Sequence, residues 1–111
     1  MSSFIIVITT AKSREEALKI VRCLLNERLI ACGNLVGPIS SLFWWENKID
    51  EASEILVFMK SSENLFKRLA ERVKEIHSYQ VPELIALPII RGSRSYLDWM
   101  NSCLRSVGED G

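Results

Sequence analysis

A single histidine and one of three cysteines are the residues of this chain best suited to bind a metal ion. His77 is the only histidine, and imidazole is a good ligand for Cu(II) and Zn(II). Cys32 supplies a thiol, and thiolates favour soft ions such as Cu(I). One hypothesis is therefore a site for copper or another divalent cation, with His77 as first candidate ligand and Cys32 as second. Each residue also has an ordinary structural interpretation. A histidine in the last turn of a helix complements the helix dipole, and free cysteines usually pack as small hydrophobic residues.

Motifs for the common catalytic chemistries are absent from the sequence. It contains no Gly-rich phosphate loop, no GxSxG nucleophile elbow and no HExxH helix. A nucleophilic pair of Cys32 and His77 is conceivable, but nothing in the sequence supports it. We therefore expect a binding protein rather than an enzyme.

Composition limits the partners and the compartment. The 111 residues fit a single domain, residues 1–111, and the 14 basic and 14 acidic residues cancel. Zero net charge argues against a general affinity for nucleic acid or an anionic membrane. The run 4–8 is too short for a signal core or a membrane span. Three cysteines without a CxxC pair indicate a reducing compartment, and we expect a cytoplasmic protein.

Hydrophobic periodicity predicts four strands and three helices along the chain. The expected elements are a strand at 4–10, a helix from 13 to about 28, strands at 29–45 and 49–60, a helix from 61 or 62 to about 77, a strand at 84–90 and a helix from 93. Ser13 and Glu16 match a capping box at the first helix start. The order is βαββαβ plus a terminal helix, the split βαβ pattern of an α+β, ferredoxin-like fold.

The second and third strands predict a hairpin about twice as long as usual. A bend or bulge is expected at 37–38 and a tight turn at 46–48. Both faces of both strands carry apolar residues, and a domain of this size cannot cover them alone. We therefore expect subunits to assemble through the hairpin, with any binding site where subunits meet. The candidate interface residues are Phe43, Trp44, Trp45 and Trp99.

The chain resembles the CutA family, the divalent-cation tolerance proteins, over about residues 4 to 103. The resemblance is carried by 27–34, 41–45, Glu54, Lys60, 77–83 and 96–99. Phe43 stands where the family usually has a tyrosine, and Ser78 where it usually has a proline.

The resemblance implies a homotrimer whose hairpins exchange strand contacts, similar to the PII signalling trimers with their clefts between subunits. It also implies a link to tolerance of copper and other divalent metals, with no firmly attached enzymatic activity. The residues that it places near an intersubunit cleft are Trp45, Glu54, Lys60, Tyr79 and Glu83. Such groups could bind a small anionic molecule, or they could form hydrogen bonds and ion pairs within the interface. A signalling or scaffold trimer that binds such a ligand or a partner protein is the alternative function.

Overall fold

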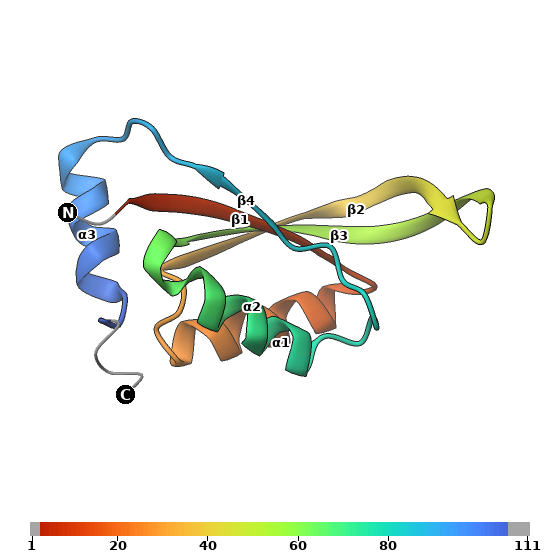
Figure 1. Ribbon diagram of the computed structural model, residues 1–111, viewed down its shortest axis with the longest axis horizontal. Coiled ribbons are helices and arrows are strands. Elements are labelled where there is room, and N and C mark those ends of the chain that lie inside the picture. Colours follow the sequence, from red (N-terminus) through yellow and green to blue (C-terminus); the bar gives the residue numbers. More distant parts are fainter. Residues whose placement is uncertain (1–2, 107–111) are drawn as a thin grey trace.

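The structure is a computed structural model that describes residues 3–106, and it consists of one antiparallel sheet with two helices on one face (Figure 1). The elements in chain order are β1 (Phe4–Ala11), α1 (Arg14–Asn26), β2 (Cys32–Trp45), β3 (Lys48–Ser62), the short 3-10 helix η1 (Glu63–Leu65), α2 (Phe66–Ile76), β4 (Ile85–Pro88) and α3 (Arg94–Cys103). The predicted ferredoxin-like α+β fold, with its long hairpin and C-terminal helix, is confirmed.

The sheet has the strand order β2-β3-β1-β4. β1 pairs along its length with the Ile55–Ser62 part of β3. The remaining residues of β3, 48–54, lie beyond the end of β1 and pair with β2, so these strands project from the body as a hairpin (Figure 1). β4 has only four residues and lies at the sheet edge, as the proline at position 88 predicts.

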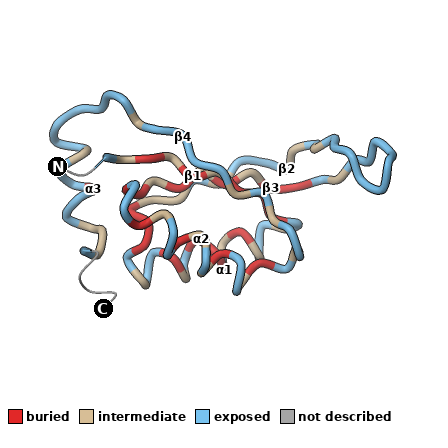
Figure 2. Tube along the Cα trace, in the orientation of Figure 1, coloured by how far each residue is buried: buried red, intermediate tan, exposed pale blue. Residues whose placement is uncertain are grey.

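The core lies between the sheet and the two helices α1 and α2. Strand side chains alternate between faces, and every second residue of β1 and β3 points to the helices. The fully buried members of this core, all 0% exposed, are Val7, Ala11, Ala17, Ile20, Leu24, Leu29, Val57, Met59, Leu65, Leu69 and Val73. Burial falls away along the hairpin towards its tip (Figure 2). None of the helices within residues 3–106 is long and apolar enough to cross a membrane.

Two elements begin three or more residues later than the sequence predicts, for local reasons, while the other boundaries differ by one or two residues. β2 begins at Cys32 rather than near 29, because Arg28 takes a left-handed conformation (φ 56°) and the Leu29 amide bonds back to the Leu24 carbonyl at 3.0 Å. This turn buries Leu29 before the strand starts. The second helix begins at Phe66, because Ser62 gives it no side-chain cap and η1 comes first.

The bulge and the turn of the hairpin are confirmed. The β2–β3 register shifts between Val36 and Ile39, and Gly37, with φ 143°, precedes a cis peptide bond to Pro38. At the tip, Glu46 and Asn47 both have positive φ, 50° and 63°. That pair of angles is typical of the two-residue hairpin turn whose twist matches the strands.

Candidate functional site

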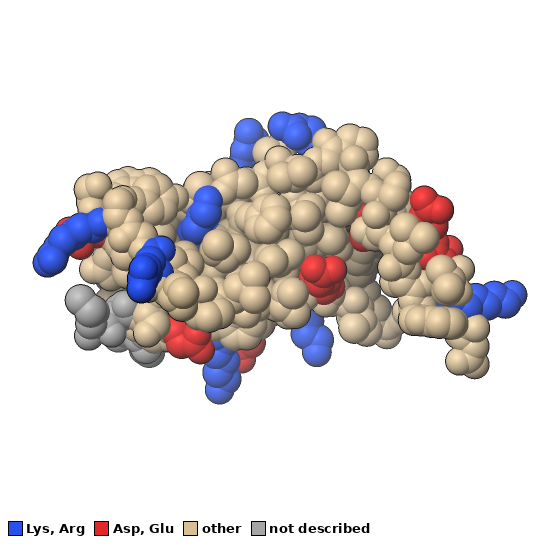
Figure 3. All heavy atoms as spheres, turned by 90° about the horizontal axis from the view of Figure 1, so that it is seen from above, with Lys and Arg blue, Asp and Glu red and all other residues tan. Residues whose placement is uncertain are grey.

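The face of the sheet away from α1 and α2 is apolar and uncovered at its centre; we refer to it as the open face. By the strand register, its apolar side chains are Ile6, Ile8, Val36, Leu56, Phe58, Ile85 and Leu87. Val36 is 47% exposed, and Ile85 and Leu87 are each 52% exposed. Seen from this side, charged side chains lie mainly around the edge of the molecule (Figure 3).

A polar cluster lies at the α3 end of the open face; we refer to its members, Cys32, Asn34, Lys60 and Tyr96, as the Lys60 cluster. Cys32 and Lys60 are directly opposite in the β2–β3 register. The Lys60 ammonium donates to Asn34 Oδ1 and lies 3.9 Å from Cys32 Sγ. Burial raises the pKa of Tyr96 on α3, and the adjacent Cys32 side chain raises it further. Among residues 3–106, no carboxylate forms an ion pair with Lys60.

A second group of polar residues lies where the chain leaves α2. Glu54, on the open face of β3, is only 7% exposed and accepts a hydrogen bond from the Tyr79 hydroxyl at 2.8 Å. Burial, together with the bond to this carboxylate, raises the pKa of Tyr79 to about 12. The Tyr79 amide donates to His77 Nδ1 at 3.0 Å, and His77 Nε2 lies 2.7 Å from the Thr10 carbonyl oxygen. The network therefore assigns a neutral imidazole with its proton on Nε2.

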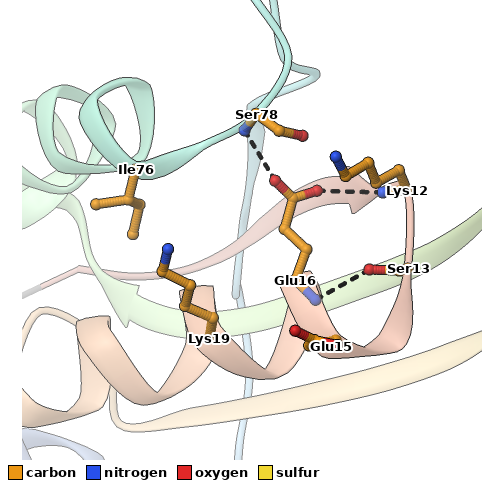
Figure 4. Close-up of a pocket in the computed structure, with 7 residues that line it drawn as sticks. All are labelled: Lys12, Ser13, Glu15, Glu16, Lys19, Ile76 and Ser78. Carbon is orange, nitrogen blue, oxygen red and sulfur yellow. Dashed lines mark hydrogen bonds between the residues drawn. The ribbon is translucent and has the colours of Figure 1, made fainter.

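Glu16 fastens the same segment to the start of α1 (Figure 4). Its carboxylate accepts from the Ser78 amide at 2.8 Å and from the Lys12 amide at 3.3 Å, while its own amide donates to Ser13 Oγ at 3.1 Å. Burial alone would raise the pKa of Glu16, but the hydrogen bonds from Ser78 and Lys12 outweigh it and lower the pKa. The predicted cap at Ser13 is confirmed, whereas the link to Ser78 has no signal in the sequence. A proline at this position would have no N–H and could not make this bond.

The two candidate metal ligands lie far apart in one chain. His77 contacts Thr10, which pairs with Leu56, whereas Cys32 pairs with Lys60. Four residues of strand separate these positions, roughly 13 Å at about 3.3 Å per residue. Residues 3–106 contain no group of three histidine, cysteine, aspartate or glutamate side chains arranged to hold a metal ion.

The candidate cleft residues also occupy separate places in one chain. Glu54 and Tyr79 are in contact. Lys60 belongs to its own cluster with Asn34 and Tyr96, whose roles the sequence did not single out. Trp45, at the hairpin tip, is 59% exposed. Glu83 lies exposed in the segment between α2 and β4.

Comparison with protein-family models matches residues 5–103 to the CutA1 divalent ion tolerance protein family. The chain belongs to this family. It is 43% identical to the divalent-cation tolerance protein CutA of Thermus thermophilus over 95 residues, which are 86% of this chain and 92% of that protein. It is 40% identical to protein CutA 1, chloroplastic, of Oryza sativa over 91% of this chain, and spans only 57% of that longer protein.

Solved structures of the family agree with the fold. The Oryza sativa CutA1 structure superimposes with a TM-score of 0.91 at 38% identity, covering 94% of this chain and 95% of that one. The periplasmic divalent cation tolerance protein CutA of Archaeoglobus fulgidus gives 0.88 at 40% identity, covering 95% and 100%. These names describe tolerance of divalent cations and not an enzymatic reaction, so membership of the CutA1 family connects the chain to divalent cations without naming one metal.

Proposed function

We propose that the chain forms a homotrimer with ligand clefts between subunits and that it acts in divalent-cation tolerance by binding the ion there. The observation that carries the proposal is the projecting hairpin, whose tip leaves Leu42, Trp44 and Ile49 66%, 72% and 66% exposed. These three share one face of the hairpin, and Phe43 and Trp45 share the other. Apolar surface on both faces favours burial between copies of the chain.

Unpaired strand edges support the same assembly. β2 and β4 are the outer strands of the sheet, and an exposed edge next to an apolar face is prone to uncontrolled pairing. Closed cyclic symmetry, as in a trimer, satisfies such edges in a limited assembly. A trimer that packs the hairpins and the apolar centres of the open faces together would cover these surfaces and leave the polar α3 end accessible.

The test is the mass in solution, measured by light scattering during gel filtration. We expect three times the chain mass for the wild type and dissociation for Trp44→Ser. Leu25→Ser is the matched control, because Leu25 is an exposed apolar residue, 38% exposed, on α1 and away from the hairpin. A stable folded monomer of the wild type would overturn the trimer.

The proposed ion is divalent, with copper tested first. Because residues 3–106 of one chain offer no three-ligand group, an ion would need ligands from more than one copy, or water. Cu(II) calorimetry on metal-stripped protein under argon should give a fixed ratio per subunit. Loss of binding in His77→Ala or Cys32→Ser would identify the ligand, with Cys103→Ser as control. Weak heats that survive both substitutions would overturn specific copper binding.

A small anionic molecule is the second candidate ligand, and Lys60 favours it. This half-buried ammonium lies on the open face without an ion-pair partner in residues 3–106, and a cation in such a place attracts an anion. Stabilisation against heat by small carboxylates or phosphates should be seen in the wild type and be absent in Lys60→Gln. Equal stabilisation of both proteins would contradict an anion site at Lys60.

We also propose a reducing compartment such as the cytoplasm. Cys23, Cys32 and Cys103 are all free thiols in the structure, which fits a reducing environment. Fractionation of the source cells tests this directly, and recovery of the protein only outside the cytoplasm would contradict it.

A further inference from the structure

The Lys60 cluster places a thiol beside a positive charge at the junction of three elements. Cys32 begins β2, Lys60 is near the end of β3, and Tyr96 belongs to α3. The Cys32 side chain is half-buried, with Sγ 3.9 Å from Lys60 Nζ and 3.7 Å from Asn34 Oδ1. An ammonium group has three N–H donors, and Asn34 accepts from it. Cys32 Sγ accepts a second N–H, so one donor remains for an incoming anion.

The other two cysteines have different surroundings. Cys23 lies between α1 and α2, where its thiol donates to Glu27 Oε2 at 3.2 Å and accepts from Arg72 at 3.3 Å. Burial, with the hydrogen bond to Glu27 and its charge, raises the pKa of Cys23. The raised pKa disfavours the Cys23 thiolate, and the nearby Arg72 cation is already paired with the Glu27 carboxylate at 2.8 Å. Cys103 is half-buried in the last turn of α3, next to Ser102.

We propose that Cys32 is a thiol–disulfide exchange site for small anionic disulfides, with the Lys60 ammonium attracting the negative charge of the reagent. The inference goes beyond the proposed ion binding and does not depend on it. A carboxylate of the disulfide would pair with Lys60 while its sulfur approaches Cys32. The two groups are on opposite strands in register, so one small molecule can reach both.

The exchange is balanced without a further reactant. The Cys32 thiolate attacks one sulfur of the disulfide, and the new S–S bond forms as the S–S bond of the reagent breaks. The released thiolate takes up the proton that Cys32 lost. Cys32 ends as a mixed disulfide, and half of the reagent is reduced to a free thiol. A second thiol reverses the reaction by the same route. An adduct at Cys32 would occupy the Lys60 cluster and make it dependent on the thiol–disulfide balance around the protein.

The first experiment locates the adduct on the wild-type assembly. The protein is treated with less than one equivalent of oxidised glutathione, digested without reductant and mapped by mass spectrometry. We expect the mixed disulfide on Cys32, and its loss in Cys32→Ser but not in Cys23→Ser or Cys103→Ser. First modification of Cys23 or Cys103 would overturn the proposal, and because the mapping uses the wild type, this result does not depend on the folding of a variant.

The second experiment tests the charge of Lys60. Rates are compared for a dianionic disulfide, dithiobis-nitrobenzoate, and a dicationic one, cystamine. The ratio of anionic to cationic rates should fall in Lys60→Gln by about fivefold or more, the effect of one unit charge roughly 4 Å away across water. Glutamine keeps side-chain N–H donors without the positive charge. Lys67 is an exposed residue of α2. Lys67→Gln removes the same charge far from Cys32 and should leave the ratio of anionic to cationic rates unchanged. An unchanged ratio in Lys60→Gln would overturn the role of Lys60 and with it the anionic preference.

Discussion

Glu16 is the residue whose contacts join two distant parts of the chain. Its carboxylate accepts from the Lys12 amide before α1 and from the Ser78 amide, 62 residues away, after α2. These bonds lower the pKa of Glu16 against the effect of its burial. A carboxyl group with a lowered pKa in the folded state stabilises the fold above its unfolded pKa. That stabilisation is lost as the pH falls through the folded value.

We predict that Glu16→Gln lowers the free energy of unfolding at neutral pH by about 1 kcal/mol, the lower range for hydrogen bonds to a partly exposed charged group. The difference from wild type should shrink as the pH falls below the ordinary pKa of 4.5. Urea unfolding at several pH values measures this. Ser78→Pro removes one of the two donors, so it should show a smaller difference of the same sign. A difference independent of pH would contradict the assignment.

Tyr79 makes the stability of the fold depend on pH in the alkaline range. Burial and the bond to Glu54 raise its pKa to about 12, so the neutral phenol stabilises the fold below the ordinary value of 10. This stabilisation is lost as the pH rises towards the folded value. Ultraviolet titration of a Tyr96→Phe variant, which leaves Tyr79 as the only tyrosine, should therefore give a midpoint near 12. A midpoint at the ordinary value would show that the Glu54 bond does not persist in solution.

At the scale of elements, the hairpin depends on one glycine. Gly37 has φ 143°, and a Cβ there would lie 3.0 Å from the Glu54 carbonyl oxygen and 3.1 Å from the Ile39 nitrogen. Both contacts are to backbone atoms, which cannot move away as a side chain could by changing its rotamer. The bulge thus requires glycine where β2 leaves the body of the sheet.

We predict that Gly37→Ala lowers the free energy of unfolding by about 1–3 kcal/mol, the usual cost of a strained backbone conformation. Ser40→Ala, an exposed position of the same strand, is the control and should change it by less than about 0.5 kcal/mol. Chemical denaturation measures both. Equal stability of the two variants would mean that the strand can realign its register without the bulge.

At the scale of the whole molecule, the core and the hairpin differ in how their apolar side chains are buried. The core between sheet and helices is closed within one chain, whereas the open face and the hairpin tip leave large apolar side chains in solvent. The proposed trimer buries them and therefore couples folding to assembly.

We predict that the thermal unfolding midpoint falls by several degrees on hundredfold dilution, because a folded state that exists as an oligomer is favoured by concentration. The trimer should also resist heat well, since three hairpins would bury more apolar area than one chain can. Calorimetry at two concentrations is the measurement. A midpoint that stays constant would indicate that each chain is stable alone and that the open face is covered in another way.

The sequence by itself determined the order of the elements, the edge position of β4, the bulge near Gly37 and the turn at 46–47. Each of these follows from local chemistry: strand and helix periodicity, a proline that cannot donate to a sheet, and Gly-Pro and Glu-Asn-Lys segments typical of bends and turns. The motif set also pointed to the CutA family, which the comparisons confirm.

Only the tertiary structure decided which side chains meet. Glu16 and Ser78, Tyr79 and Glu54, and the Lys60 cluster each join residues from different elements, and their distances depend on register and packing that no local pattern encodes. The same holds for the separation of His77 from Cys32. Both have side chains that suit a metal ion, but the sheet holds them at different positions along its length.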